Sequence, residues 1–385
     1  MRYTLEGLPG HDRIMTEIET CKMYNIDHRG NRGMIEHTID KLHPKRIEYR
    51  VVEIREESKT AKTIRLAAAN GYLPPFIPGQ YITIEAELNG IRTSRAYSIS
   101  SSAAERAFYE ITVRRSHDGF VSDWLLDQVK VGDTLFSTGP AGTFVQFTPV
   151  HGKRLVFIAG GSGITPFMSM LSTDAQKLTS DKSIDLIYGC SDEDDIIFFE
   201  QLNQLEKKGL VRLHIIISNP KADCSYRKGF ITEEAIRDIV GNDLNQCTFF
   251  LCGPSVMYDF VVPELKKMGV PRRCIRQEVQ TMPKDPTKLE GWPEGIGNDN
   301  TFVIRTTDGR SFTAKATETV LQAMERNGIV VPARCRSGEC SACRTRLVQG
   351  TVFHPGNELL RKSDMKFGYM HPCVTYPISD IIIEM

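Results

Sequence analysis

Residues 331–343 read VPARCRSGECSAC and contain Cys335, Cys340 and Cys343. A fourth cysteine, Cys373, follows after 29 further residues. Four thiolates can ligate a [2Fe–2S] cluster or a zinc ion, but zinc sites usually contain short, paired Cys or His spacings. The spacing of four residues and then two therefore favours an iron–sulfur cluster held by these four cysteines, with zinc as the alternative.

The cysteine loop lies in a compact unit that covers residues 301–385. This unit begins FVIRTTDGRSFTA, continues with the helical TVLQAMERNG, and ends in an IIIEM strand after the cysteine loop. The cysteine spacing and the preceding VPA resemble the plant-type ferredoxins, which implies an α+β β-grasp fold. Gly338 is expected to relieve crowding where the backbone approaches the sulfurs. Ser341 stands where many such ferredoxins have glycine.

Upstream, residues 46–150 contain short alternating runs such as IEYRVVEIREE and QYITIEAEL, separated by Gly, Pro and Asn turns. They predict an antiparallel β-barrel. Within them, Arg95-Ala96-Tyr97-Ser98 resembles the R-x-Y-[ST] motif of the ferredoxin–NADP reductase superfamily. The resemblance implies that Arg95 binds a flavin phosphate through its fork of donors and that Tyr97 packs on the flavin. It also implies that Ser98 faces the reactive nitrogen as a catalytic group.

A second flavin segment follows the strand ITVRR. Ser122 is expected to cap the helix SDWLLDQV, whose free N–H groups suit a pyrophosphate. The form G-x-V-S resembles the members that use FAD, so we expect FAD rather than FMN. The residues that we expect to contact FAD here are Thr112, Val113, Gly119, Val121 and Ser122.

Residues 151–281 alternate continuous apolar runs, LVFIAG, IDLIYG, RLHIIIS and CTFFLCG, with helical stretches. They predict a doubly wound α/β domain with a parallel sheet. Its glycine loop suits a nucleotide pyrophosphate, and the predicted contacts there are Gly160, Gly161, Gly163, Ile164, Thr165 and Pro166. Cys252-Gly253-Pro254 resembles the C-G-P motif beside the nicotinamide ring, which makes Cys252 a second catalytic candidate. By itself, a buried cysteine would be a small apolar residue.

Four carboxylates, residues 192–195, follow the strand IDLIYG. Because carboxylates repel the 2′-phosphate of NADPH, we expect Asp192 at the ribose and NADH as the donor. Arg227 and Lys228 could fold back toward this region, so NADPH stays open as a second donor.

The order of flavin, nucleotide and ferredoxin domains resembles the reductase components of multicomponent oxygenases and the reductase of the hybrid-cluster protein. It implies an electron-transport flavoprotein and oxidoreductase that passes electrons from NADH through FAD and [2Fe–2S] to a protein acceptor such as an oxygenase component. The alternative is a redox sensor, or an electron-entry subunit of a larger complex without a soluble acceptor. Residues 282–300, rich in Pro, Gly and charge, are expected to form a linker. Residues 1–45 form an N-terminal extension of unknown role.

Composition excludes several other classes. Lys and Arg total 48 and so do Asp and Glu, so the balance predicts no nucleic-acid partner. No apolar run reaches the roughly 18–20 residues of a membrane span, and the polar N-terminus predicts a cytoplasmic protein. The cysteine loop carries a basic rim, Arg334, Arg336, Arg344 and Arg346, against Glu339. This rim is either an ordinary solvated surface or a docking site for an acceptor with an acidic face.

Overall fold

The computed structural model describes residues 11–23, 46–117, 119–176, 182–244, 246–278, 285–356 and 360–385. The chain separates into two units, Met1–Lys45 and Arg46–Met385. In the first unit the described residues form helix α1 (His11–Met23), and the rest of the expected N-terminal extension lies outside the described residues. None of the helices described is both long enough and apolar enough to cross a bilayer.

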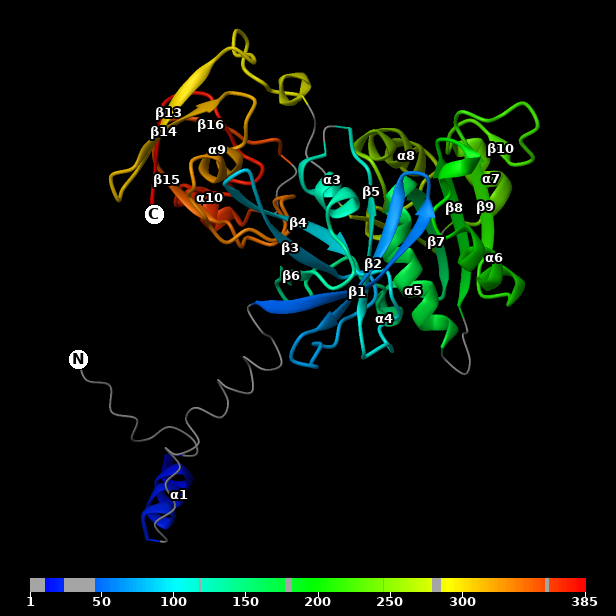
Figure 1. Cartoon of the computed structure of the whole chain (residues 1–385), viewed down its shortest axis with the longest axis horizontal. Coiled ribbons are helices and arrows are strands. Elements are labelled where there is room, and N and C mark those ends of the chain that lie inside the picture. The colour runs from blue at the N-terminus through cyan, green and yellow to red at the C-terminus, as the bar shows by residue number, and fades with distance from the viewer. Residues whose placement is uncertain are drawn as a thin grey trace. The chain divides into compact units, whose positions relative to one another are not determined.

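The flavin domain is an antiparallel barrel (Figure 1). Its strands run in the order β4-β3-β6-β1-β2-β5, and their bounds are β1 (Ile47–Ser58), β2 (Ala61–Ala68), β3 (Tyr81–Leu88), β4 (Ile91–Ser98), β5 (Tyr109–Arg114) and β6 (Thr134–Ser137). Alternate residues at the start of β1 are buried, as expected of a strand with one face on a core. A bridge between Ile99 and Ile111 joins the two edge strands, so the sheet closes. The predicted barrel is confirmed.

The nucleotide domain is built on a parallel sheet in the order β10-β9-β8-β7-β11-β12. Its strands are β7 (Arg154–Gly160), β8 (Ser183–Cys190), β9 (Arg212–Ile217), β10 (Arg227–Lys228), β11 (Cys247–Cys252) and β12 (Ile275–Glu278). Helices α5 (Thr165–Ala175) and α6 (Phe199–Lys207) share one apolar core with the sheet, and α7 (Glu233–Val240) and α8 (Ser255–Lys267) share another. Because Phe157 belongs to the first core and its neighbours Val156 and Ile158 to the second, the helices cover opposite faces. The doubly wound prediction is confirmed.

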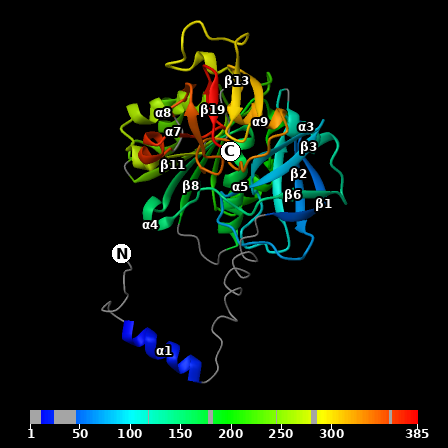
Figure 2. The ribbon, with the colours of Figure 1, turned by 90° about the vertical axis from the view of Figure 1, so that its left-hand side faces the viewer.

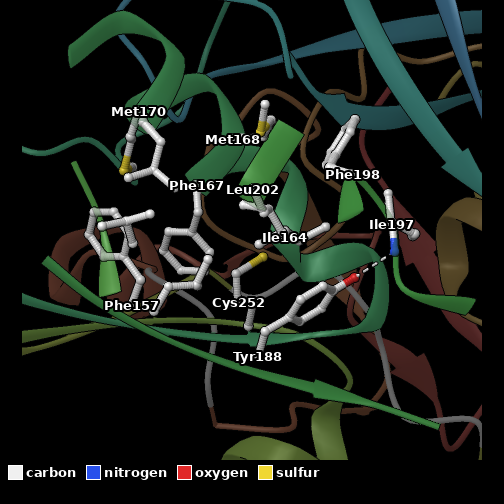
Figure 3. Close-up of a cluster of buried hydrophobic side chains, with 14 of the residues drawn as sticks. Phe157, Ile164, Phe167, Met168, Met170, Tyr188, Ile197, Phe198, Leu202 and Cys252 are labelled. Carbon is white, nitrogen blue, oxygen red and sulfur yellow. Dashed lines mark hydrogen bonds between the residues drawn. The ribbon is translucent and has the colours of Figure 1, made fainter. Parts of the chain in front are cut away.

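Aromatic packing fixes the glycine loop above this sheet (Figure 3). Phe157 and Phe167 stack with ring centroids 4.7 Å apart. The buried Tyr188 hydroxyl donates to the Gly161 carbonyl at 3.0 Å and accepts from the Ile197 N–H at 3.3 Å. The loop after β7 is therefore anchored from the neighbouring strand β8.

The ferredoxin domain has a mixed sheet in the order β14-β13-β19-β15-β17, with helix α9 beside β13 and β19 (Figure 2). The bounds are β13 (Thr301–Thr306), β14 (Ser311–Lys315), α9 (Val320–Arg326), β15 (Thr345–Gln349), β16 (Val352–Phe353), α10 (Lys362–Lys366), β17 (Tyr369–Met370), β18 (Tyr376–Pro377) and β19 (Ile381–Ile383). Thr319 and Gln322 form a capping box that starts α9. The parallel pairing of β13 with β19 agrees with the predicted β-grasp fold.

The expected linker is described from residue 285, and residues 282–284 lie outside the described residues. Its later part packs on the ferredoxin domain. The Trp292 ring lies edge-on to Phe353 and Tyr376, with centroids 4.9 and 5.8 Å away. The Trp292 indole also donates to the Ile296 carbonyl at 2.8 Å. This segment is therefore held against the ferredoxin core by aromatic contacts.

Candidate functional site

A cavity of about 530 Å³ contains most of the residues predicted to bind FAD. Those lining it are Arg95, Ala96, Tyr97, Ser98, Thr112, Gly119, Val121 and Ser122. Thr165, which was predicted to contact the nucleotide, lines this cavity instead. The ferredoxin domain completes the wall, and its contribution includes Arg336, Tyr376 and the cluster ligand Cys373. The flavin site and the predicted cluster site therefore share a boundary.

Arg95 lies at the end of this cavity where β4 approaches the ferredoxin domain. Its guanidinium donates to Thr93 Oγ1 at 2.8 Å and to the Ser94 carbonyl at 2.7 Å. Burial and the neighbouring Arg336 lower the pKa of Arg95. A partly buried guanidinium that makes no ion pair with a described carboxylate suits an anionic ligand such as a flavin phosphate.

The start of helix α3 (Phe120–Asp127) corrects one prediction. The N-cap residue is Gly119, which has no side chain to cap the helix, and Ser122 lies inside the first turn. The helix begins earlier than expected because Val121, only 2% exposed, packs in the barrel core. Among the described residues, no side chain caps the first N–H groups of α3, and the cavity runs past Gly119, Phe120 and Val121. That arrangement fits a diphosphate.

A second cavity, of about 890 Å³, lies at the carboxyl ends of the parallel strands. It is lined by four predicted nucleotide contacts, Gly160, Gly161, Gly253 and Pro254. Three exposed apolar side chains, Phe230, Val256 and Phe260, form part of its wall. Of the described residues that line it, Arg114 is the only charged one. The cavity therefore suits a large, partly aromatic ligand such as a nicotinamide nucleotide.

Arg114 and Ser162 line both cavities, so the two sites adjoin. Arg114 forms an ion pair with Asp195, which also accepts from the hydroxyls of Ser58 and Thr60, each at 2.5 Å. Burial alone would raise the pKa of Asp195, but these hydrogen bonds and Arg114 outweigh it and lower the pKa. Asp195 therefore holds a cation between the two sites.

Of the predicted flavin and nucleotide contacts, six line neither cavity, namely Val113, Gly163, Ile164, Pro166, Asp192 and Cys252. Cys252 is fully buried in the core, and its thiol donates to Glu278 Oε2 at 3.3 Å (Figure 3). Gly163 has a packing role, because a Cβ atom there would lie 2.0 Å from the Cys252 carbonyl oxygen. Neither Cys252 nor Gly163 therefore presents a side chain to either cavity.

The carboxylate run after β8 also differs from the prediction. Lys59 donates to Asp192 at 2.9 Å and Lys221 donates to Asp194 at 2.6 Å. Asp195 is buried against Arg114. The run is therefore largely neutralised by cations from distant parts of the chain, and its repulsion of a 2′-phosphate is weaker than the sequence suggested.

The four predicted cluster ligands converge. Hydrogen bonds from Cys340 and Cys373 lower the pKa of the Cys335 thiol, and Cys343 also contacts Cys373. Cys335 Sγ also accepts from the N–H groups of Ser337 and Cys340, at 3.5 and 3.3 Å. Three of the thiols are buried, and that of Cys340 is exposed.

This arrangement bears on the zinc alternative. Within the described ranges, no group of three or more His, Cys, Asp or Glu side chains is arranged to hold a single metal ion. Zinc needs four ligands around one ion, whereas each iron of a [2Fe–2S] cluster takes only two cysteines. Cys335 contacts Cys340 and Cys343 contacts Cys373, so the thiols can supply one pair to each iron.

The cluster loop has a strained backbone. Gly338 has φ 79°, which agrees with its expected role in a tight loop. Arg336 and Ser341 have φ of 56° and 55°, where residues with a Cβ are disfavoured. Ser341 thus occupies a conformation in which glycine would be unstrained, which explains the glycine of many similar loops.

The predicted basic rim is only partly present. Arg336 faces inward, where it pairs with Glu325 and lines the flavin cavity. Arg344 pairs with Asp364 at 2.8 Å, and Arg346 lies 3.8 Å from Glu384. Arg334 is exposed beside Cys335. Nearby carboxylates therefore reduce the charge of the rim.

Three family models match the chain: an oxidoreductase FAD-binding domain over residues 49–146, an oxidoreductase NAD-binding domain over 157–262, and a 2Fe-2S iron-sulfur cluster binding domain over 304–377. NADH oxidoreductase HCR of Escherichia coli (strain K12) is 29% identical over 86% of this chain and 96% of its own length. The glycine betaine monooxygenase reductase subunit of Chromohalobacter salexigens is 27% identical over 87% of this chain and 94% of its own length.

A solved structure agrees with the arrangement of domains. Phthalate dioxygenase reductase, described as a modular structure for electron transfer from pyridine nucleotides to [2Fe-2S], matches with a TM-score of 0.66. The match covers 88% of this chain and 98% of that chain at 23% identity, and it supports the fold.

Sequence reasoning missed two arginines of the site. Arg114 follows the flavin residues Thr112 and Val113 on β5, and Arg336 is adjacent to the cluster ligand Cys335. Both arginines are next to predicted ligands in the sequence, and that proximity was the signal that could have identified them. The Arg114 side chain is oriented by Asp195, which is far away in the sequence. The Arg336 side chain is oriented by Glu325, which lies on helix α9.

Proposed function

Because the chain belongs to the ferredoxin–NADP reductase superfamily of flavin and [2Fe–2S] reductases, we propose that it delivers electrons from NADH to an oxygenase component. The electrons pass through FAD and the [2Fe–2S] cluster. Several relatives are named as reductase subunits of monooxygenases, which supports an acceptor of this class.

One observation carries the proposal: Cys373 lines the flavin cavity while Cys340 is exposed. Electrons can then enter the cluster on one side and leave it on the other. FAD, when bound, accepts two electrons together and releases them singly, which matches a nicotinamide donor to a one-electron cluster. The chain supplies the orientation, since Arg95 and the start of α3 would hold the diphosphate, and Ser98 lies further along β4 in the same cavity.

Two further predicted residues, Ser98 and Cys252, belong to the same proposal. Ser98 is our candidate for the group that contacts the reacting part of the flavin. Cys252 remains a candidate only through its backbone and its link to Glu278, because its thiol is buried. We propose the domain boundaries 46–150, 151–281 and 301–385, with the segment 282–300 between the last two.

We propose that the acceptor docks around Cys340 with an acidic face. The exposed Arg334 beside Cys335 supports this, as does an excess of Arg and Lys over Asp and Glu in the ferredoxin domain. Charge of this kind acts mainly on the encounter rate and is screened by salt, because the Debye length falls from about 10 Å at 0.1 M to about 3 Å at 1 M.

The test compares Arg334→Glu with the native chain in NADH-driven reduction of a purified oxygenase component and of cytochrome c, a basic protein. Reversing the charge should slow the first reaction and should not slow the second, and added salt should reduce the difference. The matched control is Lys266→Glu, which reverses the charge of an exposed residue on the nucleotide domain. Arg344 is a poorer choice, because its reversal would also break the pair with Asp364.

The same assay separates a reductase from a sensor. A reductase turns over repeatedly with a soluble protein acceptor, whereas a sensor reduces its own cofactors once and stops. Single turnover with every acceptor, despite rapid reduction of the bound flavin, would reject the proposed function.

A further inference from the structure

We propose that Arg336, on the cluster loop, is a second ligand of the FAD diphosphate, so that flavin binding also holds the ferredoxin domain against the barrel. The proposal rests on FAD occupying the first cavity, as described above. It assigns to a residue next to a cluster ligand a direct contact with the other cofactor.

The position of Arg336 supports a contact with FAD. Its side chain is 13% exposed and lines the flavin cavity together with Arg95. Its guanidinium pairs with Glu325, with Nη1 3.1 Å from Oε2, and its Nη2 lies 3.4 Å from Ser94 Oγ. The two arginines therefore approach the same end of the cavity from different domains.

Arg336 also has an unsatisfied hydrogen-bond donor. The Arg336 Nε atom is buried and has no hydrogen-bond partner among the residues that the structure describes. A buried donor without a partner costs free energy, and proteins rarely retain one that no ligand or water satisfies. A phosphate oxygen is a suitable acceptor, because the guanidinium fork matches phosphate geometry.

The charges around Arg336 also favour an anionic ligand. Arg95 and Arg336 are two partly buried cations, and Glu325 is the carboxylate that pairs with Arg336. Arg336 is among the causes that lower the pKa of Arg95, after burial. An added anion would relieve this repulsion, and the diphosphate is the anionic part of FAD.

The same residues connect the domains. Glu325 accepts from Thr93 Oγ1 at 3.1 Å, and the carbonyls of Ala333 and Arg334 accept from Ser94 and Thr83, each at 3.3 Å. The cluster loop thus docks on β3 and β4 beside Arg95. A phosphate shared by Arg95 and Arg336 adds a contact across this interface, and binding and docking then stabilise each other.

The test uses the full chain with its cluster loaded and its flavin removed, and it measures dissociation constants for FAD, FMN and riboflavin by flavin fluorescence. Riboflavin lacks phosphate. Arg336→Gln should weaken FAD and FMN roughly 10- to 100-fold, as expected for loss of a charged hydrogen bond, and should leave riboflavin unchanged. Arg326→Gln removes the last residue of α9, which pairs with Glu318 before the helix and lies outside the cavity, and it should change none of the three constants.

Arg336→Lys keeps the charge and should give an intermediate loss for FAD and FMN, which covers the case in which Arg336→Gln does not fold. Visible circular dichroism of the cluster reports whether each variant is intact. FAD should raise the temperature at which this signal is lost in the native chain, and less so in Arg336→Gln. Equal weakening of riboflavin and FAD, or no weakening of FAD, would overturn the proposal.

Discussion

Asp195 of the nucleotide domain and Arg114 of the flavin barrel form an ion pair across the boundary between the two domains. Asp195 is 3% exposed, and Arg114 lines both the flavin and the nucleotide cavities. The pair therefore fixes a cation at the place where the two ligands meet. One carboxylate of the run after β8 therefore orients this cation.

Asp195→Asn should loosen both sites. The amide keeps the shape but loses the charge that holds Arg114. Removing one partner of a buried pair costs about 3–5 kcal/mol, and the partial exposure of Arg114 reduces this to roughly 1–3 kcal/mol. Urea denaturation measures the loss of stability, and steady-state assays should show a higher KM for NADH. Asp194→Asn, in an exposed pair with Lys221, is the control and should change stability by less than about 1 kcal/mol.

The contribution of Asp195 to stability should depend on acid pH. Because its pKa in the folded chain lies below the ordinary value of 3.8, the folded state favours the ionised carboxylate. This contribution is fully present above about pH 5 and is lost as the pH falls through the folded pKa. The difference in unfolding free energy between the native chain and Asp195→Asn should be constant from pH 7 to 5 and should shrink below pH 4. A difference that grew on acidification would contradict the assignment.

Cys340→Ser should separate the two halves of the electron path. Cys340 is the exposed ligand, and the flavin cavity is bordered by Cys373. Loss of the exposed ligand should abolish reduction of protein acceptors, because the cluster is disrupted. NADH should still reduce the flavin at the native rate, since that step occurs upstream, and stopped-flow absorbance measures it. Slow flavin reduction in a folded, FAD-loaded variant would show that the order of transfer is wrong.

The sequence predicted what depends on local pattern and missed what depends on distant partners. The cysteine spacing, the alternating strands and the glycine loop each constrain the chain within a few residues, so the three folds and the [2Fe–2S] domain could be predicted. Asp195 and Arg114 are 81 residues apart, and only the packing of two domains brings them together. The start of α3 was placed too late, because burial of Val121 outweighed the capping preference of Ser122.

The preference for NADH over NADPH should come from the nucleotide cavity rather than from the carboxylate run. Asp192 is paired with Lys59, and Arg114 is the only charged residue among those described that line this cavity. Near the ends of β8 and β9, a 2′-phosphate would meet Ser191 and Ser218. The one cation among the described lining residues is Arg114, which is paired with Asp195.

Steady-state kcat/KM values for the two donors test this preference. The native chain should favour NADH, and Asp192→Asn should leave the ratio within about threefold, because Lys59 already neutralises that carboxylate. Ser191→Arg should shift the ratio toward NADPH by roughly tenfold, since one charged hydrogen bond to a phosphate is worth about 1.5–3 kcal/mol. A native preference for NADPH would reject the assignment of the donor. A large change of this ratio in Asp192→Asn would instead show that the carboxylate run causes the preference for NADH.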